Sequence, residues 1–364
     1  MEVAEHSQGN PSPIPPPPDE VAAAAVAMSS PSLPWTSLLT VKIINTITAL
    51  SSRQNGTVNR RLLDLFAYTY KAKPNPKPIN GVSSLDVTVD PSRKLWFRLF
   101  LPAAAESSSP PLPVIVFFHG GGFAYLSADN KAYDAVARRF ARQLRAVVVS
   151  VNYRLSPEHR YPAQYDDGFD VLKFLDGGGK DVLPENADVS RCFVAGDSAG
   201  ANVAHHVAKR ACNSDDFKQL RVVGLVSIQP FFGGNERTEA EIKLAKVDPL
   251  ISVARTDWLW KAFLPSGEGA DRDHEAINVS GPRAIDLSNL KFPATMVVIG
   301  GFDSLKDWQM RYYQWLKKCG KEVYLVEYPN MVHAFYIFPQ LKESGDLIAK
   351  VMNFVDNQCS KEVK

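Results

Sequence analysis

The sequence predicts an α/β fold, in which a mostly parallel central sheet is flanked by helices. Short apolar runs alternate along the chain with runs of helical periodicity, the pattern of a parallel sheet covered on both faces. The chain has 364 residues, of which 45% are hydrophobic, so it can bury one large core. Glycine-rich or polar loops follow several of the apolar runs, at the carboxyl edge where such sheets hold their ligands.

The N-terminal region is predicted to contain a disordered segment and then a helix. Residues 1–31 are rich in Pro and Ala, and four consecutive prolines at 15–18 are typical of polyproline II and disorder. Apolar residues then recur with roughly helical spacing before the turn signal Asn55-Gly56; they are Trp35, Leu38, Leu39, Ile43, Ile47 and Leu50. Such a stripe more often belongs to a packed helix than to a membrane anchor.

The sheet is predicted from the apolar runs that follow. The runs 82–89 and 95–101, separated by Asp-Pro-Ser, predict an antiparallel hairpin at the start of the sheet. Buried strands are further predicted at 114–118, 146–152, 192–195, 222–228 and 295–299, and another strand at 323–328. A long insertion at 231–290, with helical pieces around 239–246 and 256–264, lies where a cap over a pocket is expected.

One pentapeptide predicts a nucleophile elbow. The run Gly196-Asp197-Ser198-Ala199-Gly200 follows the strand at 192–195 and precedes a helical run at 201–208. In a strand–turn–helix arrangement, G-x-S-x-G holds the serine on a sharp, strained turn, and glycines stand where a Cβ would clash. The expected result is an exposed hydroxyl above the sheet.

A glycine loop predicts a set of backbone donors. The strand at 114–118 ends in His119-Gly120-Gly121-Gly122-Phe123. Three consecutive glycines allow backbone N–H groups to turn into a cleft, where each can stabilise a developing oxyanion by roughly 2.7–4 kcal/mol.

Asp303 and His333 are the candidate acid and base. A nucleophilic serine needs a base, and the base needs an orienting acid, in the chain order serine, acid, histidine for this architecture. Asp303 follows the strand at 295–299 and His333 follows the strand at 323–328, so both fall at the edge where the elbow opens. The rival groups lie on the wrong side of a helix, on other loops or beside the serine; they are His119, His159, His205, His206, Asp197 and Asp307.

Together these motifs carry a resemblance to a known family. The stretches that carry it are His119 to Phe123, Val151-Asn152-Tyr153-Arg154-Leu155-Ser156-Pro157-Glu158-His159, Gly196 to Gly200, Gly301-Phe302-Asp303 and Met331-Val332-His333-Ala334-Phe335. From about Leu33 onwards, the chain resembles plant carboxylesterases of the hormone-sensitive-lipase group within the α/β-hydrolases. The resemblance implies an α/β-hydrolase domain at 32–364, with an N-terminal lid at about 32–80 and a cap at about 231–290.

The resemblance also implies the roles of the site residues. Ser198 is expected to be the nucleophile, His333 the base and Asp303 its partner. The N–H groups of Gly121, Gly122 and Ala199 are expected to hold the oxyanion, and no metal or organic cofactor is needed. Phe123 and Tyr125, with Phe118, are expected to form an apolar substrate pocket. Trp258, Trp260 and Phe263 either line that pocket or pack the cap onto the body.

Functions of different classes remain open. The first is hydrolysis of small apolar carboxylic esters. The second is hormone binding, because residues 55–62 resemble the N-terminal region of gibberellin receptors, which bind a hormone under a lid and do not catalyse. In those receptors an aliphatic residue replaces the triad histidine and the loop typically reads His-Gly-Gly-Ser, so His333 and Gly122 favour hydrolysis. Acyl transfer to an alcohol or amine would use the same residues.

The composition of the chain indicates which kinds of partner it binds and in which cellular compartment it is found. The net charge is +2 and no basic stripe with interleaved aromatics occurs, which argues against nucleic acid. Four scattered cysteines without a CxxC pair are typical of reduced thiols. Residues 1–20 contain four acidic and no basic residues, the wrong charge for a signal or transit peptide, and the apolar run 21–28 is too short for a membrane span. We therefore expect a cytoplasmic protein, with the nucleus also open. It is expected to bind a small-molecule ester and no membrane, and to bind a protein partner only as a receptor.

Overall fold

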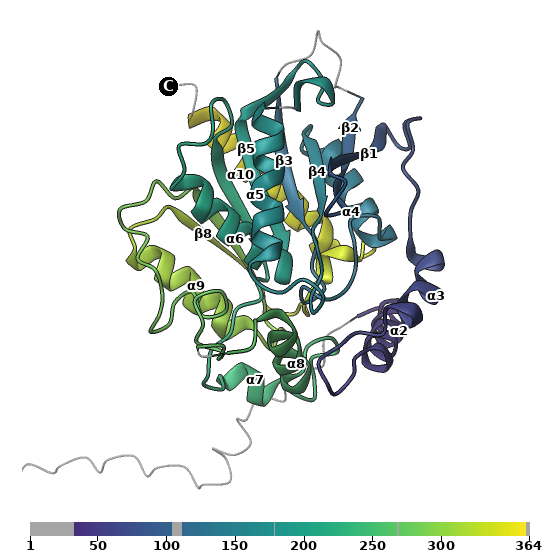
Figure 1. The fold of residues 1–364 in the computed structure, drawn as a ribbon, viewed down its shortest axis with the longest axis vertical. Helices are drawn as coiled ribbons and strands as arrows, with labels where there is room; N and C mark the ends of the chain where they lie inside the picture. The colour runs from purple at the N-terminus through teal and green to yellow at the C-terminus, as the bar shows by residue number, and fades with distance from the viewer. Residues whose placement is uncertain (1–32, 104–110, 178, 268, 362–364) are drawn as a thin grey trace, which may run out of the picture.

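The centre of the molecule is a sheet of eight strands in the order β1-β2-β4-β3-β5-β6-β7-β8 (Figure 1). The computed structural model describes residues 33–103, 111–177, 179–267 and 269–361, so the predicted disorder at 1–31 lies outside the described residues. The strands are β1 (Val82–Asp90), β2 (Leu95–Pro102), β3 (Leu112–Phe118), β4 (Val147–Asn152), β5 (Ala187–Asp197), β6 (Val222–Ile228), β7 (Ala294–Gly300) and β8 (Val323–Tyr328).

The sheet is parallel except at one edge. β1 pairs with β2 and β2 with β4 in antiparallel register, whereas all pairs from β4 to β8 are parallel. The predicted hairpin and the predicted mostly parallel sheet are therefore confirmed.

Helices cover both faces of this sheet. The helices of the described residues are α2 (Trp35–Ser51), α3 (Arg60–Tyr70), α4 (Lys131–Gln143), α5 (Ala163–Gly177), α6 (Ala199–Cys212), α7 (Glu239–Lys243), α8 (Val253–Phe263), α9 (Lys306–Lys318) and α10 (Lys342–Lys361), with short 3₁₀ turns at Gly179–Asp181 and Phe335–Ile337. α5, α6 and α9 lie on one face, and α4 and α10 lie on the other (Figure 1). No helix of the described residues is long and apolar enough to cross a membrane.

Strand β3 shows how the two faces are filled. Successive side chains of a strand point to opposite faces. Val114, Val116 and Phe118 enter the core beneath α5, α6 and α9, and Ile115 and Phe117 enter the core beneath α4 and α10. The strand is therefore apolar at nearly every position, as expected of a buried parallel strand.

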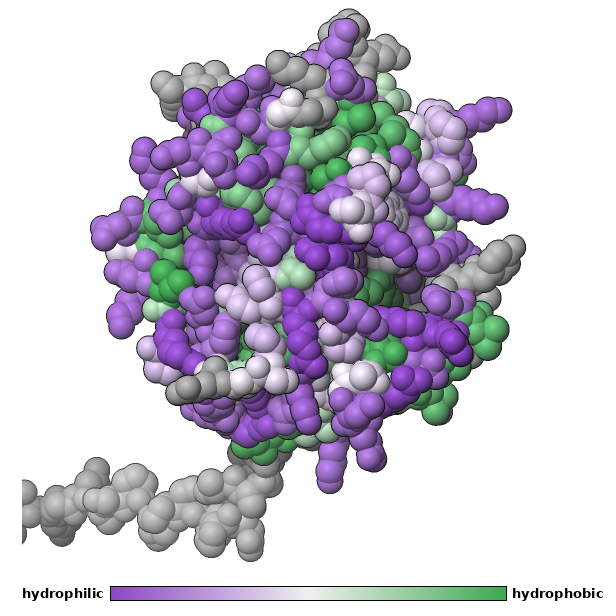
Figure 2. All heavy atoms as spheres, viewed as in Figure 1, coloured by the Kyte–Doolittle hydropathy of each residue, from purple (hydrophilic) through white to green (hydrophobic). Residues whose placement is uncertain are grey.

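Helix α2 forms where the sequence predicts it, but the orientation of its apolar stripe is the reverse of the expected one. Trp35 is 74% exposed and Leu50 is 67% exposed. The buried side is mostly polar and consists of Ser37, Val41, Thr48 and Ser51. The Thr48 hydroxyl donates to the carbonyl oxygen of Ile44 at 2.8 Å, so this polar group is satisfied within the helix and can be buried. Figure 2 shows hydrophobic atoms at the edge where Figure 1 places α2 and α3.

Candidate active site

Ser198 lies on a strained turn between β5 and α6. Its φ is 52° and its ψ is −121°, a backbone conformation that residues with a side chain rarely adopt. The Ser198 side chain makes no capping hydrogen bond to α6, although the residue occupies the N-cap position. The turn therefore leaves the Ser198 hydroxyl free of the capping role that serine usually has at this position.

The glycines on either side of Ser198 are required by close packing. A Cβ on Gly196 would lie 2.4 Å from the carbonyl carbon of Gly200, and a Cβ on Gly200 would lie 2.0 Å from the carbonyl oxygen of Phe118. Both contacts are with backbone atoms, which cannot move aside cheaply. The predicted reason for the G-x-S-x-G spacing thus agrees with the observed geometry.

Asp303 and His333 form a hydrogen-bonded pair at the carboxyl edge of the sheet. Asp303 follows β7 and His333 follows β8, and His333 Nδ1 lies 2.7 Å from Asp303 Oδ2. Because a carboxylate only accepts hydrogen bonds, the imidazole proton is on Nδ1 and the lone pair is on Nε2. Both side chains are buried, and Ser198 is 8% exposed.

Negative charges around His333 raise the pKa of its imidazole. Burial acts in the opposite direction, since it favours the neutral ring. Burial is the largest single influence, but the charge and hydrogen bond of Asp303, together with the charges of Asp248 and Asp197, outweigh it. His333 therefore holds a proton more strongly than an exposed histidine does.

The glycine loop after β3 has positive φ angles at three successive residues, a conformation that glycine adopts most easily. The φ angles are 106° at Gly121 and 62° at both Gly122 and Phe123. The Gly121 carbonyl accepts hydrogen bonds from the N–H groups of Ala124 and Tyr125, at 3.2 and 3.0 Å. Within the described part of the chain, no acceptor is recorded for the N–H groups of Gly121, Gly122 or Ala199. These are the donors that the sequence predicts for an oxyanion.

The rival histidines and acids occupy structural positions. His119 stacks on Tyr153 with ring centroids 4.3 Å apart, and burial lowers its pKa to about 4. Two further histidines lie on α6. His205 Nδ1 lies 2.9 Å from the Tyr312 hydroxyl, and His206 stacks on the ring of Tyr165.

The two rival carboxylates are also engaged elsewhere. Asp197 accepts a hydrogen bond from the Tyr133 hydroxyl at 3.0 Å, and burial raises its pKa to about 6. Asp307 accepts from the N–H of Ala240 at 2.8 Å, in the insertion. Neither carboxylate bonds to His333.

Two glutamines that the sequence did not single out hold Asp303 in place. Gln229 Nε2 donates to Asp303 Oδ2 at 3.0 Å, and Gln309 Nε2 donates to the same oxygen at 2.8 Å. Gln229 Oε1 also accepts from the N–H of Ala334, next to His333, at 2.8 Å. Gln229 directly follows β6. Its position at the carboxyl edge of the sheet was the one feature of the sequence that could have indicated a place in the site.

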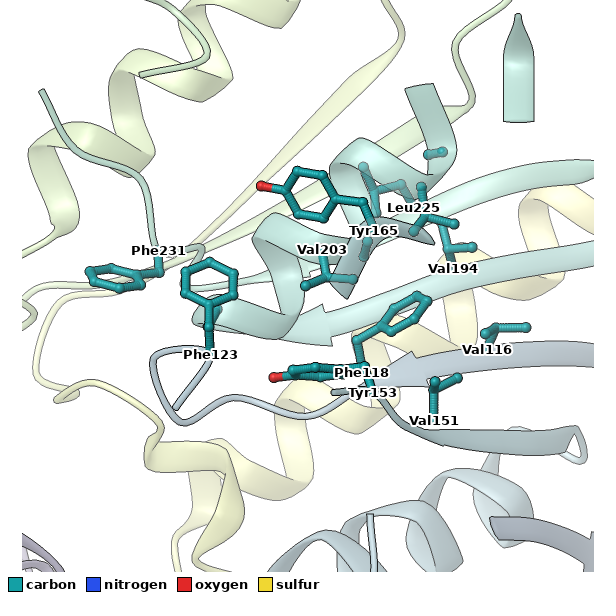
Figure 3. Close-up of a cluster of buried hydrophobic side chains, with 14 of the residues drawn as sticks. Val116, Phe118, Phe123, Val151, Tyr153, Tyr165, Val194, Val203, Leu225 and Phe231 are labelled. Atoms are coloured by element: carbon teal, nitrogen blue, oxygen red, sulfur yellow. The ribbon is translucent and has the colours of Figure 1, made fainter. Parts of the chain in front are cut away.

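Phe123 belongs to an aromatic cluster that joins the glycine loop to the insertion. Its ring is fully buried and stacks on Phe263 at 3.9 Å, while Trp260 stacks on Phe231 at 3.8 Å. Figure 3 shows Phe123 and Phe231 side by side on separate loops. Trp260 and Phe263 therefore pack the insertion onto the body, which is one of the two roles that the sequence left open for them. Phe123 is fully buried within this cluster.

The N-terminal segment and the insertion meet above the glycine loop. The Tyr125 hydroxyl hydrogen bonds with the Ser52 hydroxyl at 2.5 Å. Trp258 Nε1 donates to the carbonyl of Arg53 at 2.9 Å. Figure 1 shows α2 and α8 next to each other at this end of the molecule.

Arg60 clamps the N-terminal segment to the body. Its guanidinium donates to the carbonyl oxygens of Ala124 and Ser156, at 2.6 and 2.7 Å, and pairs with Glu158. The N-terminal segment is thus tied to the chain that continues from the glycine loop.

The comparisons with known proteins agree with this architecture. A family model described as alpha/beta hydrolase fold matches residues 115–337. The chain belongs to the α/β-hydrolase fold family. Gibberellin receptor GID1C of Arabidopsis thaliana is 41% identical over 321 residues, which cover 85% of this chain and 90% of the receptor. Carboxylesterase 20 of the same plant is 36% identical over 310 residues, covering 83% of this chain and 93% of the relative.

Solved structures of esterases share this α/β-hydrolase fold. An esterase from Pyrobaculum calidifontis superposes with a TM-score of 0.66 at 26% identity, covering 88% of this chain and 93% of that one. The α/β-hydrolase fold and the predicted relation to plant carboxylesterases and gibberellin receptors are therefore confirmed. The relatives include both named receptors and named esterases, so the family does not by itself decide between binding and catalysis.

Proposed function

We propose that this α/β-hydrolase is a serine carboxylesterase acting on small apolar carboxylic esters. The observation that carries the proposal is the 2.7 Å contact between His333 Nδ1 and Asp303 Oδ2, at the same sheet edge as Ser198 on its strained turn. This contact fixes the tautomer whose Nε2 can accept a proton from a serine hydroxyl.

The first step forms an acyl-enzyme. His333 Nε2 takes the proton of the Ser198 hydroxyl as the oxygen attacks the ester carbonyl, and the carbonyl electrons move to the oxygen. The N–H groups of Gly121, Gly122 and Ala199 stabilise this oxyanion. As the tetrahedral intermediate collapses, the bond to the alkoxy group breaks, and the proton on His333 passes to the departing alcohol.

The second step restores the enzyme. Water loses a proton to His333 as it attacks the acyl carbonyl, and the same donors hold the new oxyanion. Collapse breaks the bond to Ser198, whose oxygen recovers the proton, and the carboxylic acid leaves. An alcohol or amine in place of water would give acyl transfer, which stays open as a variant of this step.

The apolar surroundings argue for an apolar substrate. Phe123 and Tyr125 follow the glycine loop and are both buried, and we propose that they form part of the substrate pocket. Ser198 is 8% exposed and His333 is 4% exposed, so we infer that substrate enters when the N-terminal segment, acting as a lid, or the insertion, acting as a cap, moves.

Hormone binding is the second candidate, favoured by the similarity to proteins named gibberellin receptors. Under that candidate a gibberellin-like acid would occupy the same cleft beneath the N-terminal lid, and a protein partner would be expected. His333 paired with Asp303 favours hydrolysis, because an acid–base pair beside a serine has no evident use in simple binding.

We propose a cytoplasmic location, with the nucleus also open. No disulfide joins the four cysteines, all of which lie within the described residues, in keeping with a reducing compartment. The ligand in either location is a small molecule, and no nucleic acid or membrane is proposed as a partner.

Turnover of p-nitrophenyl acetate, butyrate and octanoate by the wild type and by Ser198→Ala tests the proposal. Release that depends on Ser198 and varies with chain length is expected. Asp303→Asn should lower kcat by about 10⁴, as expected when an acid no longer fixes the histidine tautomer. No release from folded wild-type protein would overturn the proposal in favour of binding.

A further inference from the structure

A carboxylate that the proposed mechanism does not use is bound to the loop of Asp303. Asp248 lies in the insertion, ahead of α8, and its Oδ2 accepts a hydrogen bond at 2.8 Å from the N–H of Ser304, the residue after Asp303. Its Oδ1 accepts from the N–H groups of Leu250 and Ile251, both at 2.9 Å. Burial and the charge of Asp303 raise the pKa of Asp248, and the N–H donors of Ile251 and Ser304 act in the opposite direction, toward the ionised form.

The turn that holds Asp248 is also bound to the N-terminal helix. Asn45 of α2 donates from Nδ2 to the carbonyl of Pro249, the residue after Asp248. The Asn45 Oδ1 accepts from the guanidinium of Arg255, whose charge also interacts with Asp248. Hydrogen bonds therefore link α2 to the turn that contains Asp248, and the Asp248 side chain links that turn to the residue next to Asp303.

We propose that Asp248 is a positioning residue for the Asp303–His333 pair and that it transmits the docking of α2 to that pair. For its kinetic consequences this inference rests on the esterase function proposed above. The N–H of Ser304 is held by Asp248 on one side of the loop, while glutamine side chains hold the Asp303 carboxylate on the other. Loss of the Ser304 contact frees this loop, and a misplacement of about 1 Å can cost roughly a hundredfold in rate.

The charge of Asp248 gives this role a signature that a purely structural role lacks. Three carboxylates face His333 and favour its protonated form; they are Asp303, Asp248 and Asp197. Asp248 in turn faces Asp303, His333 and Arg255. Removing the negative charge of Asp248 should therefore lower the pKa of His333 as well as loosen the loop.

Asp248→Asn tests the proposal, with Asp286→Asn as its matched control. Asp286 also accepts N–H and hydroxyl hydrogen bonds within a short turn, from Ser288, but it lies ahead of the amino end of β7. The imidazole protons of His333, assigned with His333→Asn, are titrated by NMR in each protein. We expect Asp248→Asn to lower the pKa of His333 and Asp286→Asn to leave it unchanged; an unchanged pKa in Asp248→Asn would overturn the proposal whether or not the protein hydrolyses esters.

Kinetics test the transmission from α2. Asp248→Asn should lower kcat for p-nitrophenyl butyrate roughly ten- to a hundredfold with little change in KM. Asn45→Ala should lower kcat by a smaller factor, and the double variant should be no slower than Asp248→Asn, because both changes interrupt one series of contacts. If the reduction of kcat in the double variant equals the product of the reductions in the two single variants, the two residues act independently and transmission through Asp248 is contradicted.

Two outcomes need separate interpretation. If Asp248→Asn does not fold, the Asn45→Ala variant is the test. The proposal then requires that Asn45→Ala both lower kcat and shift the His333 resonance. If either quantity is unchanged, the proposal is overturned. A wild type without turnover defeats the esterase function only, since the NMR titration still decides the role of Asp248.

Discussion

Gly122 offers a direct perturbation of the candidate oxyanion site. A Cβ at this position would lie 2.5 Å from Leu259 Cδ1 and 2.7 Å from Cδ2, and its φ of 62° is in the left-handed region. An alanine in that conformation costs roughly 1–2 kcal/mol, and overpacking against Leu259 costs typically about 1–3 kcal/mol more. Both strains are relieved if the loop moves away from Leu259, which displaces the N–H of Gly122.

Gly122→Ala should therefore remain folded but lose catalytic rate. Loss of one oxyanion donor costs roughly 10²–10³ in kcat, so a fall of about a hundredfold is expected. Leu259→Ala in the same protein removes the atoms that the new Cβ meets and should recover part of the rate, although the backbone strain remains. The assay is kcat for p-nitrophenyl butyrate, on protein whose Tm shows that it is folded.

Gly345→Ala is the matched control for Gly122→Ala. Gly345 lies in α10, and a Cβ there would meet no atom within 4 Å, so wild-type kcat is expected. Wild-type kcat in Gly122→Ala would refute the assignment of this loop to the oxyanion. Failure of Leu259→Ala to restore any activity would refute the steric explanation.

Three further predictions concern the N-terminal clamp and pH. Arg60→Ala should speed cleavage of α2 by chymotrypsin, because the clamp to the glycine loop is lost, whereas the exposed Arg61→Ala should not; equal rates would contradict the clamp. The raised pKa of His333 should place the acidic limb of kcat/KM above the usual histidine value of 6.5, and a limb below it would show that the base is another group. Burial lowers the pKa values of His205 and His206 well below 6.5, so the unfolded chain binds protons that the folded protein does not. The free energy of unfolding should thus fall below about pH 6.5 by roughly 1.4 kcal/mol per pH unit for each of these histidines. The lowered pKa of His119 adds to this loss, and the raised pKa values of His333 and Asp197 offset part of it. Urea unfolding with constant or rising stability down to about pH 5 would contradict this sign.

The sequence predicted the sheet and the loops at its carboxyl edge. The strands at 222–228 and 323–328 agree residue for residue with β6 and β8. β6 is largely buried and apolar, as expected of an inner parallel strand, whereas β8 lies at the edge of the sheet and is mostly part-exposed. The elbow and the pairing of Asp303 with His333 were also accessible, since each residue lies on the turn or loop at the carboxyl end of a predicted strand.

Other features depend on contacts that no local pattern encodes. The apolar stripe of α2 gave the helix but the wrong buried face, because Thr48 satisfies its hydroxyl within the helix and can be buried. Gln229 and Asp248 hold the loops of His333 and Asp303 through hydrogen bonds between residues more than fifty positions apart. Residue type and spacing alone do not distinguish such side chains from others in loops.

Intact-mass analysis after treatment with an alkyl fluorophosphonate tests the central claim most directly. A serine activated by His333 should form one covalent adduct per chain, and peptide mapping should place it on Ser198. His333→Ala should slow the labelling by several orders of magnitude, because an unassisted serine is a weak nucleophile. An unlabelled wild type, or an adduct on another residue, would contradict the account.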